Sequence, residues 1–188
     1  MIIGLIGHKG EGKSSVASLL INFHNFKGPV KFAGPLKAML VAYYRAHGLP
    51  PDQILEKIEG SLKEVPCMFL QGRTPRYAMQ TLGTEWGRNL IRDDLWIKSL
   101  QSRIKAQSEV EDMVVDDCRF LNEAAALKES GAKLVRIWRT SLNPDKTHPS
   151  ELEIGLIPVD YTIDNGGPIE ALPGEVKKML DFFKSDGA

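Results

Sequence analysis

The segment that decides the fold is Gly7-His8-Lys9-Gly10-Glu11-Gly12-Lys13-Ser14, which matches the pattern G-x-x-x-x-G-K-[ST]. Its glycines let backbone N–H groups turn inward around phosphate oxygens, and the N-terminus of a following helix adds partial positive charge. Lys13 is expected to reach the β- and γ-phosphates of a nucleoside triphosphate, and the Ser14 hydroxyl to bind Mg²⁺. The segment therefore predicts a phosphate-binding loop.

The residues on either side of this loop have the pattern that the motif requires. Residues 2–7 are a short, almost continuously apolar run with β-branched side chains, which is typical of a strand buried on both faces. Residues 14–26 have helical spacing that places Val16, Leu20 and Phe23 on one face. A buried strand, the loop and an amphipathic helix thus follow one another in the expected order.

The rest of the chain alternates between short apolar runs and helical patterns. This alternation predicts an α/β fold with a mostly parallel sheet covered by helices, in one domain over residues 1–188. The segment 141–158 contains three prolines and has the length and polarity of a lid-like loop. Further strands are expected at 30–33, 113–115, 134–138 and 161–163, and helices at 36–47, 75–92, 94–107, 122–130 and 169–183.

Composition excludes some classes of protein and favours others. Lys plus Arg and Asp plus Glu both number 24, so the net charge is zero and a long nucleic acid is not the expected ligand. Cys67 and Cys118 are far apart in sequence and show no zinc spacing or disulfide framework. The apolar N-terminal run is too short for a signal peptide or a membrane span. These features predict a soluble, cytoplasmic protein with reduced thiols.

A second acidic element follows the predicted strand at 113–115. Asp116 and Asp117 come directly after this apolar run. A phosphate-loop enzyme needs an acid near its Mg²⁺ site, although aspartate is also common where strands end. Successive residues of a strand face opposite sides, so the pattern leaves open which of the two aspartates serves the metal.

Cationic and amide side chains concentrate within residues 73–92, in and just before the helix expected from Pro75. An arginine fork can hold a phosphate with two hydrogen bonds, and a glutamine amide can bind a base edge. The cluster therefore favours a nucleoside monophosphate site over residues 50–92, and the alternative is a solvated polar helix face. The members of the cluster are Arg73, Arg76, Gln80, Arg88 and Arg92.

Two glycines interrupt the same predicted helix. Each costs about 1 kcal/mol relative to alanine, so we expect a ligand or a neighbouring helix to approach the backbone closely. Arg76, Gln80, Gly83 and Gly87 fall on one stripe at α-helical spacing. The adjacent stripe, which is expected to face the core, consists of Met79, Leu82, Trp86 and Leu90.

Isolated polar residues are weaker candidates for the site. Arg119, Arg136 and Arg139 follow or lie within predicted strands and could contact phosphate. His148, Ser150 and Glu151 lie in the lid-like segment. A single histidine of this kind is more typical of a loop than of a catalytic base.

Several blocks together resemble the bacteriophage deoxynucleoside monophosphate kinases. The more particular blocks are Gln80-Thr81-Leu82-Gly83-Thr84-Glu85 and Asp117-Cys118-Arg119-Phe120-Leu121-Asn122-Glu123. The phosphate loop and four further blocks occur in the expected order over nearly the whole chain. These four are Phe32-Ala33-Gly34-Pro35-Leu36-Lys37, Arg73-Thr74-Pro75-Arg76, His148-Pro149-Ser150-Glu151 and Asp160-Tyr161-Thr162-Ile163-Asp164-Asn165.

The resemblance implies an adenylate-kinase-like P-loop kinase with an inserted region that binds the monophosphate and a lid at 140–158. It implies transfer of the γ-phosphate of ATP, with Mg²⁺, to a deoxynucleoside monophosphate (dNMP), giving ADP and a dNDP. A homodimer and, for a phage protein, the host cytoplasm are also implied.

The resemblance also implies roles for individual residues. The catalytic residues would be Lys13, Asp117 and Arg139, with Ser14 and Asp117 at the metal. ATP would be bound by Gly7, Lys9, Gly10, Gly12, Lys13, Ser14, Ser15 and Asn165, the last in an adenine-contacting loop. The dNMP would be bound by Lys37, Arg73, Arg76, Gln80, Glu85, Trp86, Arg88 and Arg119.

Two other functions are compatible with the phosphate loop. One is a kinase for another small acceptor, such as dephospho-coenzyme A. The other is a nucleotide-dependent switch or DNA-processing accessory factor that acts through a partner. ADP formation that depends on a dNMP separates the favoured function from both.

Overall fold

The structure is a computed structural model that describes residues 1–107, 111–139 and 153–185. The chain divides into two compact units. The first unit comprises Met1–Lys31 and Leu100–Ala188, and the second comprises Phe32–Ser99. The predicted monophosphate-binding region, 50–92, lies entirely within the second unit. Most of the predicted lid, including His148, Ser150 and Glu151, lies outside the described residues.

The first unit is built on a parallel sheet, as the sequence predicts. Its described strands are arranged in the order β2-β3-β1-β4-β5, and every neighbouring pair is parallel. The strand that precedes the phosphate loop, β1, is therefore in the middle. The strands are β1 (Ile2–Ile6), β2 (Lys27–Val30), β3 (Met113–Cys118), β4 (Lys133–Trp138) and β5 (Tyr161–Asp164).

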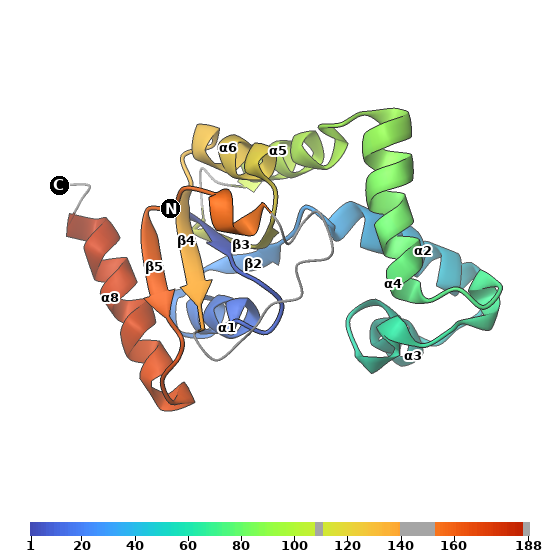
Figure 1. The fold of residues 1–188 in the computed structure, drawn as a ribbon, viewed down its shortest axis with the longest axis horizontal. Helices are drawn as coiled ribbons and strands as arrows, with labels where there is room; N and C mark the ends of the chain where they lie inside the picture. Colours follow the sequence, from blue (N-terminus) through green and yellow to red (C-terminus); the bar gives the residue numbers. More distant parts are fainter. Residues whose placement is uncertain (108–110, 140–152, 186–188) are drawn as a thin grey trace. The chain divides into compact units, whose positions relative to one another are not determined.

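Helices cover both faces of this sheet (Figure 1). Ile3 and Leu5 of β1 point to the face covered by α1 (Lys13–His24) and α8 (Leu172–Ser185), where they join one apolar core. Gly4 points to the opposite face, where an added Cβ would lie 2.9 Å from Leu127 of α6 (Leu121–Glu129). This alternation explains why β1 is apolar at every position.

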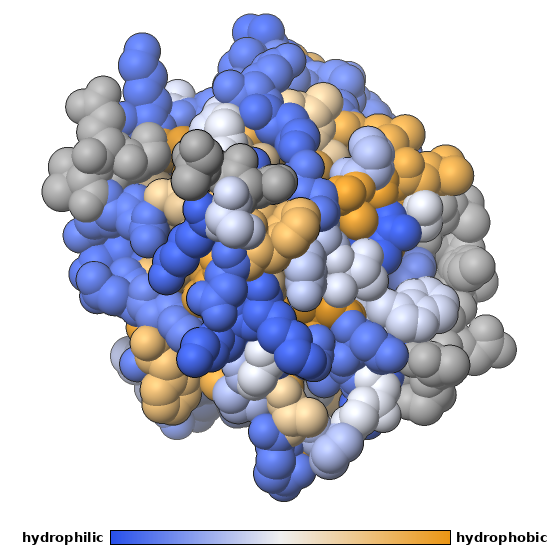
Figure 2. Space-filling model, turned by 90° about the vertical axis from the view of Figure 1, so that its left-hand side faces the viewer, coloured by the Kyte–Doolittle hydropathy of each residue, from blue (hydrophilic) through white to orange (hydrophobic). Residues whose placement is uncertain are grey.

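The C-terminal helix α8 is amphipathic, and its apolar side completes the core. Val176, Met179, Leu180 and Phe183 are buried against the sheet and α1. The view onto the side of the molecule that carries α8 shows a mainly hydrophilic surface with separate apolar areas (Figure 2). In the part of the chain that the structure describes, no helix is both long enough and apolar enough to cross a membrane.

The second unit is helical and has a small core of its own. Tyr44, Ile54 and Cys67 lie at the centre of this core. Burial raises the pKa of the Tyr44 hydroxyl, and the neighbouring Cys67 raises it further. The helices are α2 (Gly34–Ala46), α3 (Pro51–Ile58), η1 (Ser61–Glu64), η2 (Met68–Leu70), α4 (Pro75–Thr81) and η3 (Leu82–Ile91), followed by the start of α5 (Leu95–Gln107).

Three local predictions differ from the structure. The strand expected at 30–33 lies at Lys27–Val30, because Lys27 and Val30 pair with Met113 and Val115 of β3. The helix expected over 75–92 is α-helical only to Thr81 and continues as the π-helix η3. The predicted loop at 141–158 contains a short 3₁₀ helix, η4 (Ile154–Leu156), in its described part.

Candidate active site

The phosphate loop connects the end of β1 at Ile6 to the start of α1 at Lys13. Gly10 and Gly12 have φ values of 89° and 101°, a region that favours glycine. The Lys13 ammonium is buried and donates hydrogen bonds of 2.6 Å to Gly7 O and 2.7 Å to His8 O. Ser14 and Ser15 are exposed at the start of α1, and Lys9 is exposed in the loop. The loop therefore has the backbone conformation and the cation that the motif predicts.

Glu11, at a position that the motif leaves variable, is part of the internal structure of the loop. Its side chain is buried, and its Oε2 atom accepts a 2.5 Å hydrogen bond from the N–H of His8. Lys13 binds the carbonyl oxygen of the same Gly7–His8 peptide group. This peptide is thus fixed at both ends by side chains of the loop. Sequence reasoning missed Glu11 because nothing in the motif constrains its position.

Asn165 reaches the phosphate loop from the end of β5. Its side-chain amide donates a 2.9 Å hydrogen bond to the carbonyl oxygen of Glu11, and its backbone N–H donates to Trp138 O at 2.7 Å. The carboxyl ends of β1, β4 and β5 meet here because the strands are parallel. The sequence places Asn165 at the nucleotide by resemblance, and the structure places its amide on the loop backbone.

The acidic element lies beside the phosphate loop because β3 neighbours β1, with Cys118 in register with Ile6. Asp116 is buried, and its Oδ1 atom has no hydrogen-bond partner among the described residues. Its Oδ2 atom is 3.5 Å from Lys31 Nζ. Asp117 is half-buried. Burial, and then the charges of Glu123 and Asp117, raise the pKa of the Cys118 thiol.

Lys31 is a cation that sequence reasoning missed. It directly follows β2, and because Val30 of that strand pairs with Val115, Lys31 lies beside Asp116 of β3. The predicted strand at 30–33 would have placed Lys31 inside the strand. The register of β2 against β3, which the sequence does not give, is what brings this ion pair together.

Oxygen ligands suited to a hard divalent cation are present near the loop. In the described ranges, no group of three or more His, Cys, Asp or Glu side chains could hold a metal ion alone. The exposed Ser14 hydroxyl and the unpartnered Oδ1 of Asp116 are oxygen donors that Mg²⁺ prefers. Mg²⁺ usually takes most of its remaining ligands from water and phosphate. These residues therefore fit a Mg²⁺ ion that arrives with a nucleotide.

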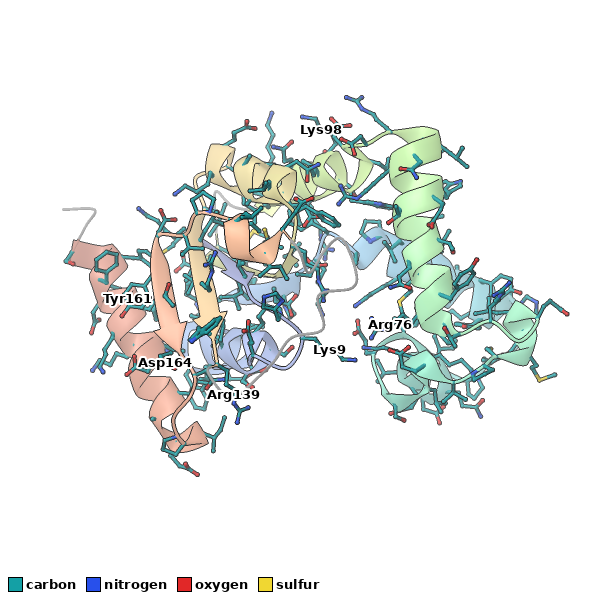
Figure 3. The ribbon with its side chains drawn as sticks, viewed as in Figure 1. Lys9, Arg76, Lys98, Arg139, Tyr161 and Asp164 are labelled. Atoms are coloured by element: carbon teal, nitrogen blue, oxygen red, sulfur yellow. The ribbon has the colours of Figure 1, made fainter. Side chains whose placement is uncertain are left out.

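The predicted arginines of the first unit differ in their surroundings. Arg136 donates hydrogen bonds to Ile154 O at 3.2 Å and to Ile157 O at 2.5 Å, which holds the described end of the predicted lid. Arg139 follows β4 and is exposed, on the same sheet edge as the phosphate loop that carries Lys9 (Figure 3). Arg119 is half-buried, and its N–H is bonded to Glu123. Of Arg136 and Arg139, Arg139 has the exposed side chain.

In the second unit, three cations predicted to bind the acceptor lie beside acidic or aromatic partners. Arg76, on α4, forms an ion pair with Glu64 (Figure 3). Lys37 pairs with Glu59 at 2.7 Å. The Arg73 guanidinium lies 4.9 Å from the centre of the Tyr77 ring. Gln80 and Glu85 are exposed, and Arg88 is half-buried.

Trp96 of α5 contacts both glycines of the predicted helix and explains why residue 87 is a glycine. Its indole N–H donates a 2.8 Å hydrogen bond to Gly83 O, an oxygen that an α-helix would use for the N–H of Gly87. A Cβ added at Gly87 would lie 2.5 Å from the Trp96 ring. At the end of η3, Arg92 N donates to Gly87 O with the five-residue spacing of a π-helix. The close approach that we predicted at Gly87 is therefore made by a tryptophan of the next helix.

The π-helix also changes which of the side chains predicted to face the core are buried. Met79 packs against the core of the second unit as expected. Trp86 and Leu90 are 37% and 76% exposed, so their predicted burial is wrong. A π-helix has more residues per turn than an α-helix, and α-helical spacing therefore assigns the wrong face after Leu82. The exposed Trp86 ring lies 6.1 Å from that of Trp96, centre to centre.

We expect Gly87→Ala to destabilise the protein by about 1 to 2 kcal/mol, because the cost of overpacking against a buried ring exceeds the gain in helix propensity. The matched control is Gly174→Ala in α8, where an added Cβ has no neighbour within 4 Å. Thermal denaturation of both variants checks this prediction. A Gly87→Ala protein as stable as the control would show that Trp96 does not require the glycine.

Comparisons with known proteins agree with this geometry. The family model described as "Deoxynucleotide monophosphate kinase" matches residues 67–176, which is more than half of the chain. A protein of Acanthamoeba polyphaga mimivirus, provisionally named a deoxynucleotide monophosphate kinase, is 32% identical over 196 aligned positions that cover 96% of each chain.

Two further similarities are shorter or more distant. A deoxynucleoside-5'-monophosphate kinase of Escherichia phage T5 is 37% identical over 57 residues, which cover 30% of this chain and 22% of that protein. The crystal structure of shikimate kinase from Aquifex aeolicus aligns with a TM-score of 0.48 and 18% identity, covering 100% of this chain and 98% of the other. Because the family model matches more than half of the chain and the mimivirus relative aligns over 96% of it, this chain belongs to the deoxynucleotide monophosphate kinase family.

Proposed function

We propose that this protein transfers the γ-phosphate of ATP to a deoxynucleoside monophosphate, giving ADP and a dNDP. The observation that carries the proposal is the phosphate loop, in which a buried lysine and two glycines with positive φ lie between β1 and α1. Membership of the deoxynucleotide monophosphate kinase family supplies the acceptor class.

The first unit binds the donor nucleotide. The loop N–H groups and the N-terminus of α1 hold the phosphates, and Lys13 exchanges its carbonyl partners for phosphate oxygens. Ser14 and an acid near the end of β3 would hold Mg²⁺, and the ion would supply positive charge to the phosphates. Asp117 matches the family block, and the unpartnered Asp116 Oδ1 offers a second oxygen for the metal or its water.

The second unit binds the acceptor. Arg73, Arg76 and Arg88 hold the monophosphate, with Lys37 as a further cation of the same unit. The acceptor contact predicted for Arg119, which belongs to the first unit, stays a prediction. Gln80 and Glu85 can form hydrogen bonds with the base, and the exposed Trp86 ring can stack on it. Each cation with an acidic partner must exchange a carboxylate for phosphate when the acceptor binds.

Transfer needs little covalent chemistry from the protein. The acceptor phosphate oxygen is already anionic near neutral pH, so no strong general base is required. Catalysis then depends on holding both phosphates for in-line attack and on cations that stabilise the transferring group. Lys13 serves the donor side of that group, and Arg139 is the proposed additional cation.

A coupled ADP-release assay tests the proposal, with ATP, Mg²⁺ and each of the four dNMPs in turn. ADP release that requires a dNMP establishes the kinase and its base preference together. Slow hydrolysis that is indifferent to all four dNMPs would contradict it and favour a nucleotide-dependent switch. Activity with dephospho-coenzyme A but with no dNMP would identify a different acceptor.

A further inference from the structure

Asn165, directly after β5, donates a side-chain hydrogen bond to the phosphate loop. Its Nδ2 atom lies 2.9 Å from the carbonyl oxygen of Glu11, a residue 154 positions away in sequence. The Asn165 backbone is fixed in turn, because its N–H donates to Trp138 O at the end of β4. Through its side chain and its backbone, Asn165 thus connects the phosphate loop to the ends of β4 and β5.

The phosphate loop packs closely against the side-chain amide of Asn165. A Cβ added at Gly12 would lie 2.3 Å from Asn165 Nδ2, and Gly12 has a φ of 101°. The space beside Gly12 is therefore occupied by the Asn165 side chain. Gly12 is required both by its backbone conformation and by its neighbour.

The contact continues through Glu11 to the inner peptide of the loop. While Asn165 holds the Glu11 carbonyl, the Glu11 carboxylate accepts the N–H of His8. Lys13 binds the carbonyl of the same Gly7–His8 peptide. Loss of the Asn165 contact removes the hydrogen bond to the Glu11 carbonyl and leaves the longer bond of 3.4 Å from Glu11 N–H to His8 O. We therefore expect a looser Glu11 backbone and a less fixed Gly7–His8 peptide beside Lys13.

We propose that Asn165 is a positioning residue that preorganises the phosphate loop for the triphosphate, acting through Glu11 and Gly12. This inference rests on the proposed function, because it assumes that the loop binds ATP. Preorganised N–H groups bind phosphate without first having to be ordered, so their loosening weakens nucleotide affinity. The effect is specific to the donor, because none of these contacts involves the second unit.

The first experiment measures ATP binding by calorimetry for the wild-type protein and for Asn165→Ala, together with the KM for a dNMP. We expect the Kd for ATP to rise about five- to tenfold, which corresponds to the loss of one hydrogen bond. The KM for the dNMP should change less than twofold. The control is Asn22→Ala, an exposed asparagine on α1, which should leave both values unchanged.

A double-mutant cycle with Gly12→Ala tests the contact itself. Gly12→Ala should weaken ATP binding strongly in the wild-type background and less strongly when Asn165 is also alanine, because part of its cost is the collision with the amide. If Asn165→Ala does not fold, Asn165→Leu keeps a similar side-chain volume and removes the hydrogen-bond donor without adding a charge to the loop.

The outcomes separate this inference from the proposed function. Wild-type protein that binds ATP, with weaker binding by Asn165→Ala and coupling to Gly12, supports the positioning role. Wild-type affinity in Asn165→Ala, or strictly additive effects in the cycle, would overturn it. A wild-type protein that binds no ATP would overturn the proposed function itself.

Discussion

Replacement of Lys13 by alanine should reduce phosphoryl transfer by at least about 10²- to 10³-fold, the range found when one preorganised charge-stabilising group is removed. The Lys13 ammonium lies over the Gly7 and His8 carbonyls, at 2.6 and 2.7 Å, inside the loop that we propose to hold the triphosphate. No other described cation occupies this loop interior, since Lys9 is exposed. The coupled ADP-release assay measures the loss.

The fold should survive this change, because the Lys13 ammonium binds carbonyls within the loop and the apolar core is built from other, hydrophobic side chains. Thermal denaturation checks that the variant is folded. Lys178→Ala is the matched control, since Lys178 is on the surface of α8 and pairs with nearby Glu175. A folded Lys13→Ala protein with near-normal turnover would show that the role proposed for Lys13 is wrong.

Replacement of Arg76 by alanine should raise the KM for the dNMP by about 10- to 100-fold, the equivalent of one or two charge-assisted hydrogen bonds to phosphate. The KM for ATP should stay within twofold, because Arg76 belongs to the second unit and the phosphate loop to the first. Initial rates with each substrate varied in turn separate the two constants. An equal increase in the two KM values would show that Arg76 is not part of the acceptor site.

The Glu64 partner gives this prediction a second test. The Arg76–Glu64 pair has side-chain exposures of 36% and 56%, so it contributes little stability and a phosphate dianion can replace the carboxylate. Glu64→Gln should therefore not raise the KM for the dNMP, and a modest decrease is expected. Arg45→Ala, at an exposed position of α2, is the control for loss of a cation from the same unit.

The sequence alone determined the parallel α/β sheet, the phosphate loop and the family. These features depend on local patterns: buried strands are apolar at every position, and the loop requires glycines at fixed spacing. The resemblance to the monophosphate kinases agrees with the family model over residues 67–176. The roles of the individual site residues remain predictions that the variants above test.

Only the tertiary structure determined which distant residues meet. Asn165 contacts Glu11, and Lys31 contacts Asp116, because parallel strands bring their carboxyl ends together whatever their separation in sequence. Local sequence patterns also gave the wrong burial for Trp86 and Leu90 in the second unit. A local period cannot reveal that Trp96 binds Gly83 and packs on Gly87, and this tertiary contact accompanies the π-helix that turns Leu90 outward.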